Sequence, residues 1–263
     1  MSVDRRCAVI LGASSGFGEA ASLELARAGF DIVGVHLDRK GTMPHVEKVI
    51  NGVQAAGREA IFFNVNAADP ERRVEVLARA KAAFGEFPGV HILLHSLAFG
   101  NLRPFIAQDP ADAITPAQMD MTLSVMAHSL VYWTQDLVYA GLLRRGDKVF
   151  AMTSAGGTRV LPNYGAVSAA KAALEAHVRQ LAMELAPRGV AVNAIRAGVT
   201  DTPALRKIPG HELISDHARL RNPSGRLTTT EDVARALVAL SAPGTEWITG
   251  NVIGVDGGED IVG

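Results

Sequence analysis

The sequence has little cysteine, few aromatic residues and no surplus of charge of either sign. Its 263 residues include a single cysteine, and aromatic residues make up 5%. Cys7 alone excludes an internal disulfide and a thiolate metal cluster, so no metal site is predicted and a reducing, cytoplasmic location is expected. Lys and Arg total 26 against 27 Asp and Glu. This balance argues against nucleic-acid binding, which needs a basic face.

Long hydrophobic runs are also missing. No stretch of about 18 apolar residues occurs, so we expect no membrane span. The apolar run at residues 7–11 is too short for a signal peptide and ends in a glycine-rich turn, which indicates a first strand. Hydrophobic residues still make up 48% of the chain and charged residues 20%, which is typical of globular proteins.

Short apolar runs alternate with helical segments along the whole chain. Runs of about 4–8 apolar residues between turn residues are typical of buried parallel strands. We expect strands at residues 7–11, 31–35, 59–63, 90–94, 148–152, 190–195 and 252–255. We expect helices at residues 19–28, 44–56, 70–84, 116–143, 164–186 and 230–242. The first three are expected to end at the glycines Gly29, Gly57 and Gly85, which cap a helix without strain. This alternation predicts an α/β fold, a single doubly wound Rossmann-type domain over residues 1–263. We expect a seven-stranded parallel sheet in the order 3-2-1-4-5-6-7, with helices on both of its faces.

A glycine-rich turn joins the first strand to the first helix. Residues 12–18 read Gly-Ala-Ser-Ser-Gly-Phe-Gly. Such a turn lets the backbone approach a pyrophosphate, and the helix N-terminus offers free N–H groups. The turn predicts a dinucleotide site, with an ordinary strand–helix turn as the alternative. Its expected contacts are Gly12, Ser14, Ser15, Gly16, Phe17 and Gly18.

A tyrosine and a lysine share one predicted helix. Tyr164 begins this helix, and Lys171 follows seven residues later. Seven residues bring a helix back close to its starting angle, so both side chains lie on one face. The other tyrosines, Tyr132 and Tyr139, lie on the preceding long helix and are more typical of packing.

These motifs resemble the short-chain dehydrogenase/reductase family. The Gly-x-x-x-Gly-x-Gly turn resembles the family in general, and Tyr-x6-Lys resembles its bacterial enoyl-acyl-carrier-protein reductases. Residues 95–99, His-Ser-Leu-Ala-Phe, are similar to the type I enzymes, whereas the intact glycine turn and the segments at 102–104 and 201–205 are more similar to type III. The resemblance implies NAD(P)H-dependent reduction of trans-2-enoyl thioesters, on acyl carrier protein or CoA, in fatty-acid biosynthesis. It also implies a homotetramer formed through the fourth and fifth helices, where Trp133 and the Tyr132/Tyr139 pair would suit a buried subunit interface.

The resemblance also assigns catalytic roles. Tyr164 would hydrogen-bond the thioester oxygen, and Lys171 would hold the nicotinamide ribose. Ser154 is either an assisting donor or only a strand-end residue. Met126 stands where most of the family has a catalytic asparagine, so the proton relay of the carbonyl-reducing branch is missing. His95 is expected to be a structural histidine rather than a catalyst.

The remaining expected contacts concern the cofactor and the acyl chain. Asp38 would accept from adenosine ribose hydroxyls, whereas Arg39 and Lys40 would pair with a 2′-phosphate; NADPH is favoured over NADH, and a solvated charge cluster is the alternative. Further cofactor contacts are expected at Asn64, Val65, Ser96, Leu97, Ala98, Thr153, Lys171, Gly198, Val199, Thr200 and Thr202. The substrate is expected to contact Phe99, Leu102, Tyr164 and Leu205, together with Ile208 and Leu213. A substrate loop is expected at residues 197–229, and its part 203–222 is expected to be a mobile lid over the acyl chain.

Two other functions stay open. A carbonyl or 3-oxoacyl-thioester reductase would share the fold, but the seven-residue spacing and Met126 argue against it. A non-catalytic dinucleotide sensor would keep the glycine turn and would need neither Tyr164 nor Lys171.

Overall fold

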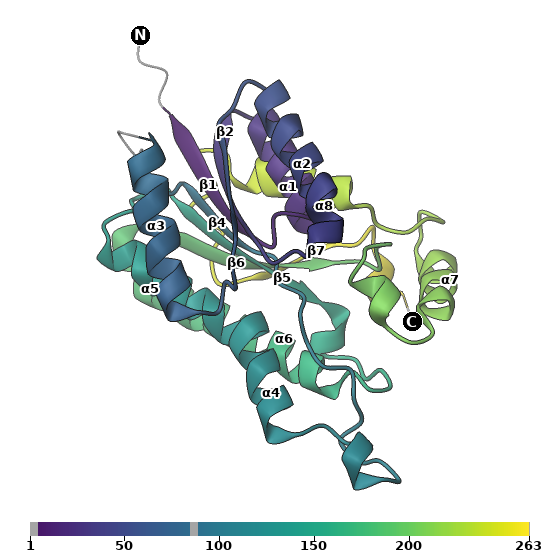
Figure 1. Cartoon of the computed structure of the whole chain (residues 1–263). Helices are drawn as coiled ribbons and strands as arrows, with labels where there is room; N and C mark the ends of the chain where they lie inside the picture. The colour runs from purple at the N-terminus through teal and green to yellow at the C-terminus, as the bar shows by residue number, and fades with distance from the viewer. Residues whose placement is uncertain (1–4, 85–88, 263) are drawn as a thin grey trace.

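A computed structural model describes residues 5–84 and 89–262, and a single parallel sheet runs through its centre (Figure 1). Its strands follow the order β3-β2-β1-β4-β5-β6-β7, and every neighbouring pair is parallel. The predicted α/β fold and strand order are therefore confirmed. The strands are Arg6–Leu11 (β1), Phe30–His36 (β2), Ala60–Asn64 (β3), Ile92–His95 (β4), Lys148–Ser154 (β5), Ala191–Ala197 (β6) and Val252–Val255 (β7).

Helices cover both faces of the sheet, and a separate hydrophobic core lies under each layer. One layer holds Gly16–Arg27 (α1), Met43–Ala55 (α2) and Thr230–Leu240 (α8). The other holds Pro70–Phe84 (α3), Pro116–Leu123 (α4), Ser129–Tyr139 (α5) and Gly165–Leu185 (α6). The predicted glycine cap of α3, Gly85, lies outside the described residues. Within the described ranges, no helix combines the length and the apolarity needed to cross a membrane.

Most strands run one or two residues beyond their predicted C-terminal ends. The apolar runs stop at Val35, Leu94 and Ile195, whereas the backbone pairing between neighbouring strands continues to His36, His95 and Ala197. Backbone pairing does not depend on an apolar side chain, so polar residues can close a strand. These ends form the edge of the sheet where the site lies.

The helix predicted at residues 116–143 is interrupted, so that prediction was wrong in part. A π-helical turn, Ser124–His128, separates α4 from α5. Such a turn adds one residue to an otherwise continuous helix, and the 3.6-residue pattern used for the prediction assumes regular α-helical turns, so it does not mark the insertion. The helix also ends early, because Gly141 adopts a left-handed conformation (φ 68°) and the N–H of Leu142 turns back to the carbonyl of Leu137.

The substrate loop predicted at residues 197–229 contains a helix that the sequence analysis missed. Residues His211–Arg221 form α7, which lies beside the C-terminus in Figure 1. Ala218 is the only buried residue of this helix. Most residues of α7 are polar, so its composition is typical of a loop and does not indicate a helix.

Trp133 belongs to the core of the protomer, which corrects its expected place in a subunit interface. Its side chain is 0% exposed, and its indole Nε1–H donates to the carbonyl of Ala67 at 2.8 Å. The indole is thus already covered by its own chain. Tyr139 is 81% exposed, and Tyr132 is partly exposed beside the guanidinium of Arg73.

Candidate active site

The glycine turn after β1 forms a backbone cradle. The N–H groups of Gly12 and Ala13 donate to the carbonyl of Val35 at 2.8 and 3.1 Å. A Cβ on Gly18 would lie 2.0 Å from the carbonyl oxygen of Gly12, and a Cβ on Gly12 would lie 2.3 Å from that of Ser96. Only glycine fits these two positions, so the turn can present its backbone to a ligand.

The N-terminus of α1 opens onto this cradle. The N-cap residue Ser15 makes no side-chain cap with the described residues, which leaves N–H donors and the positive end of the helix dipole for an anion. Thr202 lies next to the turn, since a Cβ on Gly16 would be 3.6 Å from its methyl carbon. A Cβ on Gly12 would also lie 3.5 Å from a side-chain carbon of Leu97. The cradle therefore fits the pyrophosphate of a dinucleotide, with residues from β1, β4 and β6 around it.

The end of β2 carries a hydrogen-bonded carboxylate. Asp38 and Asn64 exchange two hydrogen bonds through the backbone of Asp38, at 2.9 and 3.0 Å. Burial works against ionisation of Asp38, but hydrogen bonds from Ser14 and Thr42 outweigh it and lower the pKa of Asp38. The carboxylate is therefore charged and bound to the glycine turn. Arg39 and Lys40 are exposed immediately after it.

Tyr164 is placed by two unusual backbone positions. Asn163 precedes it in the left-handed region (φ 61°), which asparagine tolerates better than most residues. Gly156 makes room for the ring, because a Cβ there would lie 2.5 Å from Cε1 of Tyr164 and 3.3 Å from Oγ of Ser154. Burial raises the pKa of Tyr164, and the nearby Ser154 hydroxyl only partly opposes this. The phenol is thus a protonated donor at neutral pH.

Lys171 lies two turns further along α6 and is almost fully buried, with 6% exposure. Its Nζ donates to the carbonyl of Met152 on β5 at 2.7 Å. Burial lowers the pKa of Lys171 to about 8, although Glu175 opposes this shift. The ammonium keeps two further N–H groups, which could donate to ribose hydroxyls.

His95, at the end of β4, is a buried structural histidine, as expected. Its Nε2 lies 2.8 Å from Oγ of Ser129, whose own proton goes to the carbonyl of Val125 in the π-helical turn. The hydroxyl therefore accepts from Nε2–H. Burial and the charge of Lys171 lower the pKa of His95 to about 3, so the ring is neutral. Met126, in the same turn, is buried and brings no polar side-chain group to the site.

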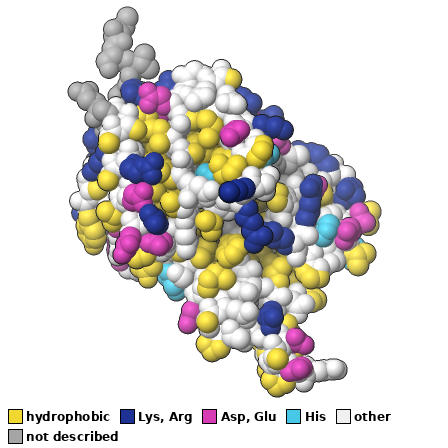
Figure 2. All heavy atoms as spheres, in the orientation of Figure 1, with side chains coloured by type: hydrophobic (Ala, Val, Ile, Leu, Met, Phe, Trp, Pro, Cys, Tyr) yellow, Lys and Arg dark blue, Asp and Glu magenta, His cyan; other side chains and the backbone are white. Residues whose placement is uncertain are grey.

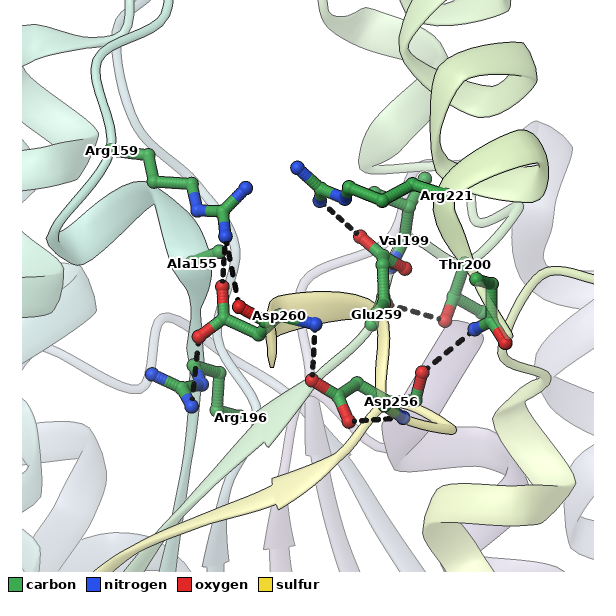
Figure 3. A network of polar contacts seen from close by, with 12 residues as sticks. Ala155, Arg159, Arg196, Val199, Thr200, Arg221, Asp256, Glu259 and Asp260 are labelled. Carbon is green, nitrogen blue, oxygen red and sulfur yellow. Dashed lines mark hydrogen bonds and ion pairs between the residues drawn. The ribbon is translucent and has the colours of Figure 1, made fainter. Parts of the chain in front are cut away.

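Three carboxylates near the C-terminus, Asp256, Glu259 and Asp260, form a cluster that we call the C-terminal clamp (Figure 3). Glu259 is 3% exposed; its Oε2 accepts from the N–H of Val199 at 2.9 Å, and its Oε1 pairs with Arg221 of α7 at 3.1 Å. Asp260 pairs with Arg159 and Arg196 at 2.7 and 2.9 Å. The clamp thus joins α7, the end of β6 and the segment before Tyr164.

Sequence reasoning missed the clamp and the partners of two expected cofactor contacts. The N–H of Val199 is occupied by Glu259, and Oγ1 of Thr153 donates to Glu175 at 2.7 Å. Neither group is free in this structure. The first pair lies 60 residues apart in the sequence and the second pair 22 residues apart. No short sequence motif predicts such contacts.

The remaining expected residues lie around the same edge. Phe99 and Leu213 are largely exposed, whereas Leu102 packs against the core. Figure 2 shows Lys and Arg side chains gathered near the middle of one face, next to hydrophobic ones. The other expected contacts sit on segments that follow strand ends: Val65, Ala98, Gly198, Thr200, Leu205 and Ile208.

Comparison with known proteins gives the family. A family model described as "Enoyl-(Acyl carrier protein) reductase" matches residues 12–259. The chain belongs to this branch of the short-chain dehydrogenase/reductases. It is therefore an oxidoreductase of the short-chain dehydrogenase/reductase family.

Individual family members differ in their named activities. The crystal structure of an enoyl-[acyl-carrier-protein] reductase (NADH) from Aquifex aeolicus superposes with a TM-score of 0.84 at 25% identity, covering 98% of this chain and 97% of that one. A short-chain dehydrogenase from Burkholderia cenocepacia in complex with NADP has a TM-score of 0.81 at 28% identity and covers 98% of each chain. The 3-oxoacyl-[acyl-carrier-protein] reductase of Pseudomonas aeruginosa is 28% identical over 98% of both sequences.

Proposed function

We propose that the protein reduces the C2–C3 double bond of a trans-2-enoyl thioester to give the saturated acyl thioester. The observation that carries this proposal is the position of Tyr164 and Lys171, seven residues apart on one face of α6. The Aquifex aeolicus enzyme, which carries the named activity, supports it through its similar fold. Acyl carrier protein or CoA is the proposed carrier of the substrate.

The spacing has a chemical reason. In carbonyl reduction, the hydride arrives at the carbon that bears the oxygen. In enoyl-thioester reduction, it arrives at Cβ, which is two carbon–carbon bonds further from that oxygen than the carbonyl carbon is. In the carbonyl-reducing members that the chain resembles, the lysine follows the tyrosine by four residues. Here it follows by seven, so the pair is three residues further apart, about 4.5 Å along the helix axis. That distance lets the phenol meet an oxygen remote from the carbon that is reduced.

In the proposed reduction, Tyr164 acts on the substrate, whereas Lys171 and the glycine turn bind the cofactor. The phenol of Tyr164 donates to the thioester oxygen and stabilises the enolate that forms there. Lys171 holds the ribose hydroxyls, and the glycine turn with the N-terminus of α1 holds the pyrophosphate. When bound, the dinucleotide supplies the hydride for Cβ. Cα then takes a proton from solvent, which completes the reduction.

The proposed cofactor is NADPH, with NADH as the alternative. Arg39 and Lys40 are exposed where a 2′-phosphate would attract them. Asp38 has the opposite preference, because its charged carboxylate is suited to ribose hydroxyls. The exposed pair supports NADPH, and the kinetic comparison below tests the choice.

A carbonyl or 3-oxoacyl-thioester reductase is the second candidate. The similarity to the Pseudomonas aeruginosa 3-oxoacyl reductase supports it. Against it, Met126 is buried where the carbonyl-reducing pattern has an asparagine. A non-catalytic dinucleotide sensor is a third candidate, and it gives no reason for Tyr164 to be held against Ser154 and Gly156.

One assay separates these functions. Oxidation of NADPH and of NADH is followed at saturating crotonyl thioester and, in parallel, acetoacetyl thioester. We expect turnover of the crotonyl substrate. Turnover of acetoacetyl thioester alone would assign the carbonyl reductase, and binding of the dinucleotide without any turnover would favour the sensor.

A further inference from the structure

Glu175 and Lys171 occupy consecutive turns on the inner face of α6, and both reach the same stretch of β5. Nζ of Lys171 donates to the carbonyl of Met152 at 2.7 Å. The next residue of the strand, Thr153, donates its Oγ1 proton to Oε1 of Glu175, also at 2.7 Å. The ammonium and the carboxylate are therefore fixed against two successive residues of one strand, without a direct ion pair within 4.0 Å between them.

The turn after β5 covers this pair. A Cβ on Gly157 would lie 3.4 Å from Oε1 of Glu175 and 3.4 Å from Cβ of Lys171. The carboxylate thus lies in a seam between α6, β5 and the turn at Ala155–Gly157, and it is only partly accessible to solvent. In such a seam a charge acts more strongly on its neighbour than it would in water.

The other titratable groups that face Lys171 do not balance its charge. His95, from β4, is neutral and fully buried, and Tyr164, from α6, is a protonated phenol. Among the described residues, Glu175 is the carboxylate that acts on Lys171. Burial lowers the pKa of Lys171 to about 8, and Glu175 counteracts that burial.

We propose that Glu175 is a positioning residue for Lys171, which from the next turn of α6 keeps the buried ammonium charged beside the cofactor site, while the carbonyl of Met152 holds it in place. This inference rests on the proposed role of Lys171 in binding the dinucleotide. The hydrogen bond from Thr153 fixes the carboxylate in place. A neutral amide could accept the same hydrogen bond, so replacing Glu175 by Gln separates its charge from its contact with Thr153.

The test measures dinucleotide affinity against pH, with no thioester present. NADPH and NADH are titrated by cofactor fluorescence from pH 6 to pH 9.5 with the full-length protein. In the wild type, Lys171 is charged below its pKa, so affinity should fall as the pH rises through about 8. Glu175→Gln keeps the acceptor for Thr153 and removes the charge. We expect its inflection about one pH unit lower, with affinity about fivefold weaker at pH 8 and unchanged at pH 6.

Three further variants separate charge from packing. Glu175→Asp restores the charge and should return the inflection toward the wild-type value. Thr153→Val keeps the charge but releases the carboxylate from its hydrogen bond, so its inflection should lie between those of the wild type and Glu175→Gln. Glu184→Gln changes an exposed glutamate on the same helix and serves as the matched control.

The outcomes are distinct. If Glu175→Gln shows the same pH inflection of dinucleotide affinity as the wild type, whatever its thermal stability, Glu175 serves only as the acceptor for Thr153 and the inference is overturned. Wild-type affinity that is flat across pH 8 would overturn it as well, because Lys171 would not bind the dinucleotide through its charge. A shifted inflection in a protein that reduces neither thioester would uphold the inference while removing the proposed function.

Discussion

At the residue scale, Tyr164 is the side chain on which the proposed chemistry depends. It is partly buried, its pKa is raised, and its ring fits against Gly156 and Ser154. Asn163 supplies the left-handed backbone that turns the chain into α6. The phenol is therefore held in one place before any ligand arrives, which favours stabilisation of a developing oxyanion.

Replacing Tyr164 by Phe keeps the ring and removes the donor. We expect kcat for crotonyl thioester to fall about 10²-fold or more, the scale of losing one oxyanion donor. The dinucleotide Kd should stay unchanged, as measured by fluorescence titration. Unchanged turnover would exclude Tyr164 from the mechanism.

Arg39 is the residue that tests cofactor choice. We expect Arg39→Ala to raise the KM for NADPH about tenfold, because a charged hydrogen bond to the 2′-phosphate would be lost. The KM for NADH should not change, and steady-state kinetics with both cofactors provide the measurement. Equal effects on the two cofactors would contradict a contact with the 2′-phosphate.

Individual residues were predictable from the sequence only where they belong to a local motif. The glycine turn and the Tyr164–Lys171 pair lie within short windows, and the fold brings both to one edge of the sheet. Glu175 and Glu259 gave no such signal, since their partners come from other elements. Glu175 accepts a hydrogen bond from Thr153, and Glu259 accepts one from Val199. Both contacts form only when the chain is folded, so the spacing of residues in the sequence does not predict them.

At the scale of elements, the short turn at Ala155–Gly157 links β5 to the tyrosine and lysine of α6. Gly156 touches the ring of Tyr164, and Gly157 covers Glu175 and Lys171. The strands and most helices were predictable, because their apolar runs and glycine caps are local. The π-helical turn and α7 were not, because the turn is a local insertion inside a continuous helical segment and α7 is mostly polar.

The turn can be tested with Gly156→Ala. The added methyl group would lie 2.5 Å from Cε1 of Tyr164 and 3.3 Å from Oγ of Ser154, so the ring must move. We expect kcat to fall about tenfold or more, because about 1 Å of misplacement at a reacting group can cost this much or more. Thermal unfolding checks that the fold survives. The exposed neighbour Thr158→Ala is the control and should keep wild-type kcat; a similar loss in both would point to a general distortion of the turn.

At the scale of the whole molecule, two cores hold the helical layers on the sheet, and Trp133 anchors one of them. We expect Trp133→Phe to lower the free energy of unfolding by about 1–3 kcal/mol, because the carbonyl of Ala67 would lose its buried donor. Urea denaturation measures the change. If the variant instead loses subunit association while the free energy of unfolding of the protomer stays unchanged, Trp133 would belong to a subunit interface.

The C-terminal clamp also sets the order in which the site can be assembled. Glu259 and Asp260 hold Arg221, Val199 and Arg159, which belong to three earlier segments of the chain. During translation, the glycine turn and the tyrosine leave the ribosome long before these carboxylates do. A nascent chain can therefore form most of the sheet while α7 has no anchor. A premature stop codon after residue 257 would leave β7 intact and remove Glu259 and Asp260, the two carboxylates that tie these segments together.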